Sequence, residues 1–200
     1  MAMDYDQSIL KARLAQLSPS ARVAFAAACA TRLVPLYERY SAEVDTGDPR
    51  LLHQAIDTVW NWVRGDQIAM TYVAAQIEQL DTLTPTERQA AAPSGAYADD
   101  AIASAIYALQ SIAEPGAQNA AWAAARVINS VTDFVCARWK RTVGRFPSPD
   151  EGFADPAVVT VLARIERDLK ELEAAGEGAL ATLGDRLRAR AVVESTDLCL

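Results

Sequence analysis

The chain has few of the residues that usually carry chemistry. Its 200 residues include one histidine and three cysteines, Cys29, Cys136 and Cys199. An odd number of cysteines without a CxxC spacing argues against a zinc site and against a disulfide framework. Cys29 and Cys136 lie in apolar segments, where a thiol behaves as a small hydrophobic side chain. Because glycine-rich phosphate loops and GxSxG, HExxH and EF-hand patterns are also absent, we predict no catalytic residue, no metal and no cofactor.

Long apolar segments and targeting signals are absent too. No stretch reaches the ~18 consecutive apolar residues that suggest a membrane-spanning helix. The first residues, MAMDYDQ, are acidic and lack the basic patch and apolar run of a secretory signal. We therefore expect a cytoplasmic protein that does not bind membranes.

The composition favours one folded domain. Hydrophobic residues make up 51% of the chain and charged residues 22%, as in ordinary soluble domains. A chain of this length can bury about 70% of its surface around a single core. We predict one domain over residues 1–200. Gly176, Gly178 and Gly184 loosen its last part, so we expect residues 175–200 to form a weaker helix and a frayed tail.

Basic residues are nearly absent from one long segment. Between Gly65 and Ala125, seven acidic residues face Arg88 alone, a net charge of −6. These acidic residues are Asp66, Glu78, Asp81, Glu87, Asp99, Asp100 and Glu114. The next twenty residues, Arg126 to Arg145, hold five basic residues against Asp133 and carry +4. An acidic segment of this kind disfavours nucleic acid as a partner and favours a basic protein.

Helical periodicity is strongest between Val23 and Tyr40. Apolar and small residues recur there every three or four positions, which places them on one face of a helix. The many alanines of this segment allow another helix to approach closely, whereas Arg22, Arg32, Glu38 and Arg39 mark the solvent side. We therefore predict that this helix is central to the fold.

The rest of the chain also reads as helices. Further helices are predicted over residues 5–17, 49–65, 66–80, 86–92, 99–113, 117–141, 156–172 and 180–193. Ser18 or Ser20, Asp48 and Asp155 are the expected N-caps, and residues 146–156 are expected to form a loop. No segment alternates like a strand. The fold class is therefore all-α, a single-domain bundle of about seven to eight helices without a sheet.

Several segments together resemble a known family. They are LAQLSPSARVAFAAACATRLVPLYERY, GDPRLLHQAIDTVWNWV, YADDAIASAIYALQSI and DPAVVTVLARIERDLKELE. They resemble the YjaG-like family of small all-helical bacterial proteins, classed as a domain of unknown function. The sharpest points of likeness are Phe25, Ala27, Arg32, Pro35, Tyr37, Gly47, Asp48, Asp57 and Trp60. The resemblance implies a helical bundle and brings no activity with it.

One helical flank is the sharpest candidate for a chemical site. His53, Asp57, Trp60 and Arg64 follow one another at helical spacing, so that neighbours are within side-chain reach. A histidine and a carboxylate four residues apart could bind a metal or share a proton, but a third ligand is missing. A structural cluster of hydrogen bonds and ion pairs is the alternative that we favour.

Other features also allow two interpretations. Trp60 and Trp62 flank an apolar stripe and are either core residues or interface anchors. Asp99 and Asp100 either complement a helix N-terminus or dock a partner. The spacing of Val158, Leu162, Ile165, Leu169 and Leu172 is that of a heptad seam, which lies either inside the chain or between two copies in a homodimer.

The functional prediction is a non-catalytic protein-binding module. We expect an immunity-type inhibitor that masks a basic bacterial toxin through an acidic surface. The residues predicted to bind the partner are Asp66, Glu78, Asp81, Glu87, Tyr97, Asp99 and Asp100. The alternatives are an enzyme that binds a metal or small molecule near His53 and Asp57, and a structural homo-oligomer.

Overall fold

The chain folds as a bundle of helices. The computed structural model describes residues 5–90, 92 and 94–197, which are 82% helical and contain no strand. Ten α-helices occur there, eight of them at least seven residues long, which confirms the predicted all-α bundle. The elements are α1 Gln7–Gln16, α2 Pro19–Val44, α3 Pro49–Val63, α4 Met70–Asp81, α5 Glu87–Ala90, α6 Gly95–Ala113, α7 Ala117–Val143, α8 Pro149–Phe153, α9 Pro156–Ala174, the 3₁₀ helix η1 Glu177–Ala179 and α10 Leu180–Thr196.

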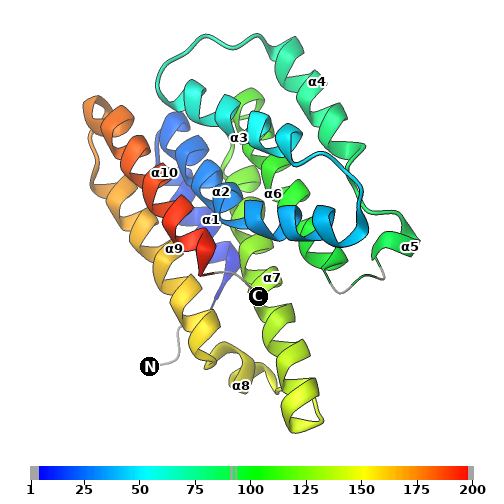
Figure 1. Cartoon of the computed structure of the whole chain (residues 1–200). Coiled ribbons are helices and arrows are strands. Elements are labelled where there is room, and N and C mark those ends of the chain that lie inside the picture. The colour runs from blue at the N-terminus through cyan, green and yellow to red at the C-terminus, as the bar shows by residue number, and fades with distance from the viewer. Residues whose placement is uncertain (1–4, 91, 93, 198–200) are drawn as a thin grey trace.

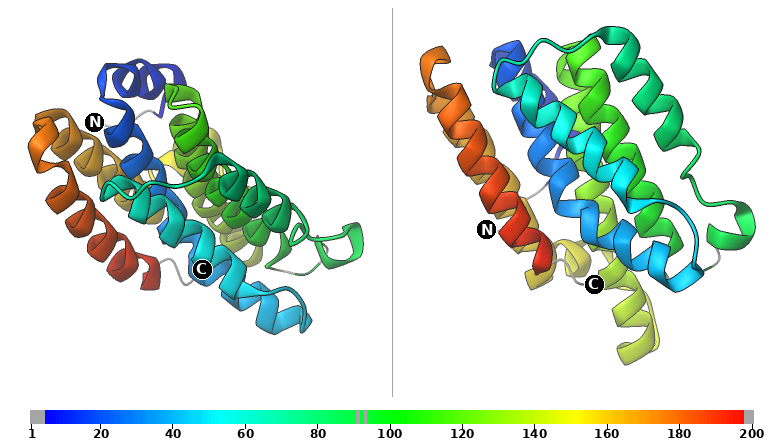
Figure 2. Two further views of the ribbon diagram at one scale, coloured as in Figure 1. Left: turned by 90° about the horizontal axis from the view of Figure 1, so that it is seen from above. Right: turned by 45° about the horizontal axis from the view of Figure 1, so that its top comes forward.

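Helix α2 is the central element, as predicted. It packs against α3, α6, α7 and α10, and the other helices surround it (Figure 1, Figure 2). The hydroxyl of Ser18 accepts a hydrogen bond from the amide of Ala21, so Ser18 is the N-cap. Nothing among the described helices is long and apolar enough to cross a membrane.

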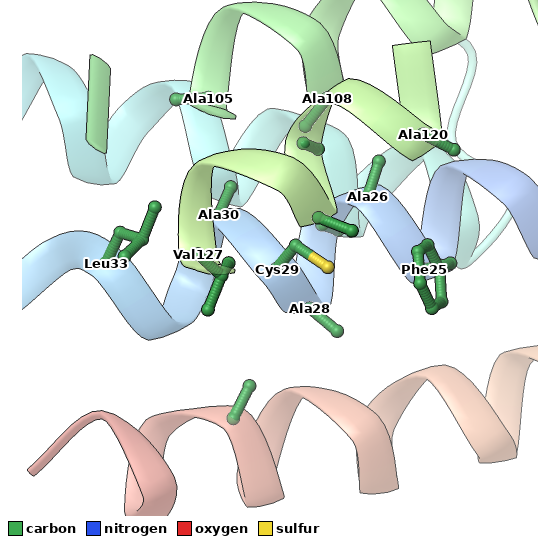
Figure 3. Packing of buried hydrophobic residues seen from close by; sticks show 14 of the residues in the cluster. Phe25, Ala26, Ala28, Cys29, Ala30, Leu33, Ala105, Ala108, Ala120 and Val127 are labelled. Carbon is green, nitrogen blue, oxygen red and sulfur yellow. The ribbon is translucent and has the colours of Figure 1, made fainter. Parts of the chain in front are cut away.

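Small side chains allow the helices around α2 to lie close together. Ala26, Ala28 and Ala30 are buried, with exposed fractions of 0%, 0% and 1%. Figure 3 shows Ala26 and Ala30 on the side of α6 and α7, while Ala28 points the other way, toward α10. Because α2 is covered on several sides, its buried surface is much wider than one stripe.

The end of α2 requires a glycine. Asp45 and Gly47 have φ angles of 50° and 82°, in the left-handed region that favours glycine. A Cβ atom added to Gly47 would collide with the hydroxyl of Tyr37. The connection to α3 therefore turns tightly over Tyr37, and Asp48 then caps α3 by accepting a hydrogen bond from the amide of Arg50 at 3.0 Å.

Helices α9 and α10 form a hairpin along one side of the bundle (Figure 1). The five heptad residues of α9, Val158, Leu162, Ile165, Leu169 and Leu172, are all buried within the chain. The seam is therefore internal, the first of the two interpretations given above. The helix predicted over residues 180–193 is α10, whose Leu183, Leu187 and Ala191 are buried. Cys199 lies outside the described residues.

Three predicted helix boundaries differ from those in the structure and were wrong. The helix expected from residue 66 begins only at Met70, because Gly65, with a φ of 104°, turns the chain after α3. The helix expected from residue 99 begins at Gly95, four residues earlier. Part of the expected loop is helix α8, which a capping box stabilises: Ser148 and Glu151 exchange side-chain to backbone hydrogen bonds.

Candidate functional site

Four of the predicted partner-binding residues gather at one corner of the molecule. Glu78 and Asp81 lie in the last turns of α4, Glu87 begins α5, and Asp99 lies in the second turn of α6. The three segments meet at this corner (Figure 1). We call these four residues the acidic corner. All four are exposed, and none forms an ion pair with any other residue that the structure describes.

The carboxylates elsewhere contrast with the acidic corner. Arginines pair with Asp48, Asp57, Glu151, Asp155, Glu166, Asp185 and Asp197. No ion pair within the described residues engages the carboxylates of the acidic corner, so they remain available to an outside charge, with Arg88 of α5 as the basic residue beside them.

Exposed apolar side chains share α4 with the acidic corner. Met70 and Tyr72 are 47% and 52% exposed. Met70, Ala74, Glu78 and Asp81 are spaced by four, four and three residues, so they lie along one stripe of the helix. A partner that lies along α4 would meet both apolar surface and negative charge.

Asp66 lies apart from the acidic corner. It is exposed, but it follows Gly65 at the end of α3, and the connection from there runs to the start of α4, the opposite end from Glu78 and Asp81 (Figure 1). Asp66 therefore belongs to a different part of the surface.

Asp100 was wrongly assigned to the docking surface. It is only 5% exposed, and its carboxylate accepts hydrogen bonds from Ser130 at 2.8 Å and from Arg126 at 3.3 Å. Because α6 begins at Gly95, neither Asp99 nor Asp100 lies in its first turn. Asp100 instead ties α6 to α7.

Burial of Asp100 predicts a dependence of stability on pH. Burial raises the pKa of Asp100 to about 6, and the hydrogen bonds from Ser130 and Arg126 only partly oppose it. The unfolded chain titrates near the ordinary aspartate pKa of ~3.9. Because the pKa of Asp100 is higher in the folded protein than in the unfolded chain, the folded protein binds the proton more readily. The free energy of unfolding therefore rises as pH falls from 7 to 5. We expect a gain of roughly 1 kcal/mol that the Asp100→Asn variant lacks. Urea unfolding of both proteins at pH 7 and pH 5 measures it, and parallel changes would contradict the assignment.

Tyr97 faces a different surface from the acidic corner. Its half-buried ring lines a groove with Arg39, Arg138 and Arg141. Burial raises the pKa of the Tyr97 hydroxyl, and the negative charge of Asp133 adds to the effect. Tyr97 and Asp99 are two residues apart on α6, which turns their side chains to opposite sides of the helix. Tyr97 therefore does not serve as an apolar neighbour of the acidic corner.

The side chains of the His53 flank contact two neighbouring helices, α2 and α10. The Nε2 atom of His53 lies 2.8 Å from Oε1 of Glu38 on α2. Asp57 pairs with Arg188 of α10, and Arg64 donates to Asp185 of α10 at 2.9 Å. These contacts hold α3 to its neighbours, and no three potential ligands among the described residues are placed to bind a metal. These hydrogen bonds and ion pairs support the interpretation of the His53 flank as a structural cluster.

Trp60 belongs to the core. It is 2% exposed, and its indole nitrogen donates a hydrogen bond to the Thr31 hydroxyl at 3.0 Å. Trp62 is half-buried against the same core. The indole of Trp60 therefore joins α3 to α2 in the interior and does not form a binding surface.

The sequence interpretation missed a buried cluster of charges. Arg32, expected on the solvent side of α2, is 1% exposed. Its guanidinium donates to Asp168 of α9 at 2.5 Å and to Glu194 of α10 at 2.9 and 2.7 Å. Asp168 is fully buried and Glu194 is 7% exposed. Three helices are thus joined by one arginine in the interior.

Further arginines complete this buried cluster. Arg190 donates to Asp168 at 2.6 Å, and Arg167 donates to Glu194. Burial alone would raise the pKa of Glu194, but the hydrogen bond from Arg167 and the charge of Arg32 outweigh it and lower that pKa below its ordinary value. Glu194 is therefore held as an anion, and the contacts of Glu194 and Asp168 with Arg32 bind the α9–α10 hairpin to α2.

The buried thiol beside this cluster is unreactive. Cys29 is 1% exposed, and burial raises its pKa to about 12. A thiol that stays protonated at neutral pH is a poor nucleophile. Cys29 therefore behaves as the small hydrophobic side chain that the sequence predicted.

Comparison with known proteins identifies a family. A search of curated proteins finds no match. The fold is similar to the crystal structure, at 1.91 Å, of a DUF416 family protein from Shewanella baltica OS155, with a TM-score of 0.78 and 19% sequence identity over 91% of this chain and 92% of that one. Residues 9–175 match the family described as protein of unknown function (DUF416). The chain therefore belongs to the DUF416 family.

Proposed function

We propose that this protein is a non-catalytic binding module that holds a basic protein against its acidic corner. One observation carries the proposal. Glu78, Asp81, Glu87 and Asp99 are exposed together and form no ion pair within the described residues, whereas several carboxylates elsewhere, such as Asp48, Asp57 and Glu151, pair with arginines. Unpaired charges of one sign attract an oppositely charged partner over several ångströms and raise its association rate.

The apolar part of α4 supports the same proposal. Charged residues at the rim of a protein interface give specificity and fast association. Aromatic and methionine side chains supply much of the binding energy. Met70 is exposed on the same stripe of α4 as Glu78 and Asp81 and fits this role, whereas Tyr97 does not. The proposed interface therefore runs along α4 to the start of α6.

A basic bacterial toxin is the partner class that we propose, because masking such a protein needs only a complementary surface. The alternative of a metal or small-molecule enzyme near His53 and Asp57 is less well supported, since these side chains are engaged with Glu38 and Arg188. The homo-oligomer gains no support from α9, whose heptad residues are buried within the chain. That this chain belongs to a YjaG-like group within the DUF416 family stays a prediction from the sequence.

Charge reversal at the acidic corner tests the proposal. The protein is co-expressed with the products of its neighbouring genes, and the affinity of any basic protein that co-purifies is measured. The Glu78→Lys/Asp81→Lys variant should bind at least about tenfold more weakly at low salt, a loss of roughly 1.4 kcal/mol. The difference should shrink as the salt concentration rises.

Glu114→Lys is the control for a charge reversal outside the acidic corner. Glu114 is exposed in the same acidic segment, but it lies at the far end of α6, where a lysine suits the helix dipole. This variant should bind like the unmodified protein. Equal affinity of all three proteins would refute the acidic corner as the binding site.

A further inference from the structure

A groove lined by arginines and aromatic rings lies between α2, α6 and α7. Its volume is about 320 Å³, and it is lined by Leu36, Arg39, Ser94, Tyr97, Phe134, Ala137, Arg138 and Arg141. The residues Leu36, Phe134 and Ala137 give it an apolar floor, and the three arginines come from two different helices. Ligand pockets usually begin at about this volume.

The charged groups around the groove favour an anion. Arg138 pairs with Asp155, and its guanidinium lies over the Phe134 ring, 5.4 Å from the ring centre. Arg141 is exposed and has no ion pair within the described residues. Besides Asp155, two acidic groups lie beside lining residues: Asp133, whose negative charge acts on Tyr97 and whose pKa burial raises, and Glu43, which accepts a hydrogen bond from Ser94.

We infer that this groove binds a small anion that carries an aromatic or similarly flat apolar body. The guanidinium of Arg141 would hold a carboxylate or phosphate, for which arginine provides two parallel donors. The body would pack against the lining rings of Phe134 and Tyr97 and against the guanidinium of Arg138, which lies over the Phe134 ring. The volume admits one ring system and is too small for a protein helix, which is about 10 Å wide. This site is independent of the proposed acidic interface.

Titration with simple probes tests the inference. Phenyl phosphate, benzoate, benzyl alcohol and inorganic phosphate are each added to the full chain, and the NMR shifts of the Tyr97 and Ala137 amides are followed. Phenyl phosphate or benzoate should give saturable shifts at these residues, and the stronger of the two identifies the preferred charged group. Benzyl alcohol and inorganic phosphate should each bind at least about tenfold more weakly, because benzyl alcohol lacks the anionic group and inorganic phosphate lacks the apolar ring.

Two variants test whether the probe binds in the groove or is only attracted by the positive charge of the surface. Arg141→Gln removes an exposed guanidinium and should weaken binding of the preferred probe about tenfold. Arg186→Gln changes the charge equally on α10, where the side chain is 67% exposed, and should leave binding unchanged. Equal effects of the two variants, equal binding of benzyl alcohol or inorganic phosphate, or no saturable shift with either anion would overturn the inference.

Discussion

The Arg32→Met variant is expected to lose about 3–5 kcal/mol of unfolding free energy, the usual cost of breaking a buried ion pair. Methionine has a similar length and no charge, so the variant leaves Asp168 and Glu194 facing the interior with less compensation. Both are nearly inaccessible, with exposed fractions of 0% and 7%. Arg190 still contacts Asp168 and Arg167 still contacts both carboxylates, but these two side chains are 24% and 41% exposed, whereas Arg32 is buried with the carboxylates.

Arg13→Met is the matched control for Arg32→Met. Arg13 also bonds two carboxylates, Glu166 at 2.6 Å and Glu173 at 2.8 Å, but its side chain is 31% exposed. Water can replace these contacts, so we expect a loss of at most about 1 kcal/mol. Urea unfolding followed by circular dichroism measures both variants. Similar losses of unfolding free energy for the two variants would show that the contribution of the Arg32 cluster to stability does not depend on its burial.

The Trp60→Ala variant is expected to lose about 3–5 kcal/mol, the usual cost of truncating a buried tryptophan. The indole of Trp60 is 2% exposed and donates a hydrogen bond to Thr31 on α2. Its removal leaves a cavity between α3 and α2, and it also unpairs an acceptor in the interior. The space cannot close easily because α10 packs on the same side, with Gly184 close to the Trp60 ring.

Trp62→Ala provides the comparison within the same helix. Trp62 is half-buried, so its truncation should cost about 1–2 kcal/mol, less than that of Trp60, because less apolar surface returns to water. Thermal and urea unfolding compare the two. A larger loss at Trp62 would contradict the placement of Trp60 as the core anchor of α3.

Local signals in the sequence predicted much of the fold. Ser18, Asp48 and Asp155 all cap the helices that follow them, since each accepts a hydrogen bond from an amide of the first turn. Such contacts involve neighbours two or three residues apart, which a sequence displays directly. The heptad seam of α9 is visible for the same reason.

The buried charge cluster could not be predicted in this way. Arg32 lies 136 residues from Asp168 and 162 residues from Glu194 along the chain. A helical wheel shows that Arg32 leaves the main apolar stripe of α2, but it does not show that α9 and α10 cover that side. Asp168, next to Leu169 in an apolar seam, was the available signal, because a charge there implies a buried partner.

The exposure of the acidic residues was predicted in part, for a similar reason. Composition marked Glu78, Asp81, Glu87 and Asp99 as an acidic group, and their exposure follows from the polar flanks of their helices. Composition could not separate Asp100, because one residue along a helix turns the side chain by about 100°. That turn places Asp100 against Ser130 and Arg126, while Asp99 stays exposed.

Hydrogen exchange of the complex with its basic partner tests the central proposal most directly. The amides of α4 and of the first turns of α6 should exchange more slowly in the complex than in the free protein, while those of α9 and α10 should not change. Protection confined to α9, α10 or the end of α7, with α4 unaffected, would contradict the proposal that the acidic corner is where this protein binds.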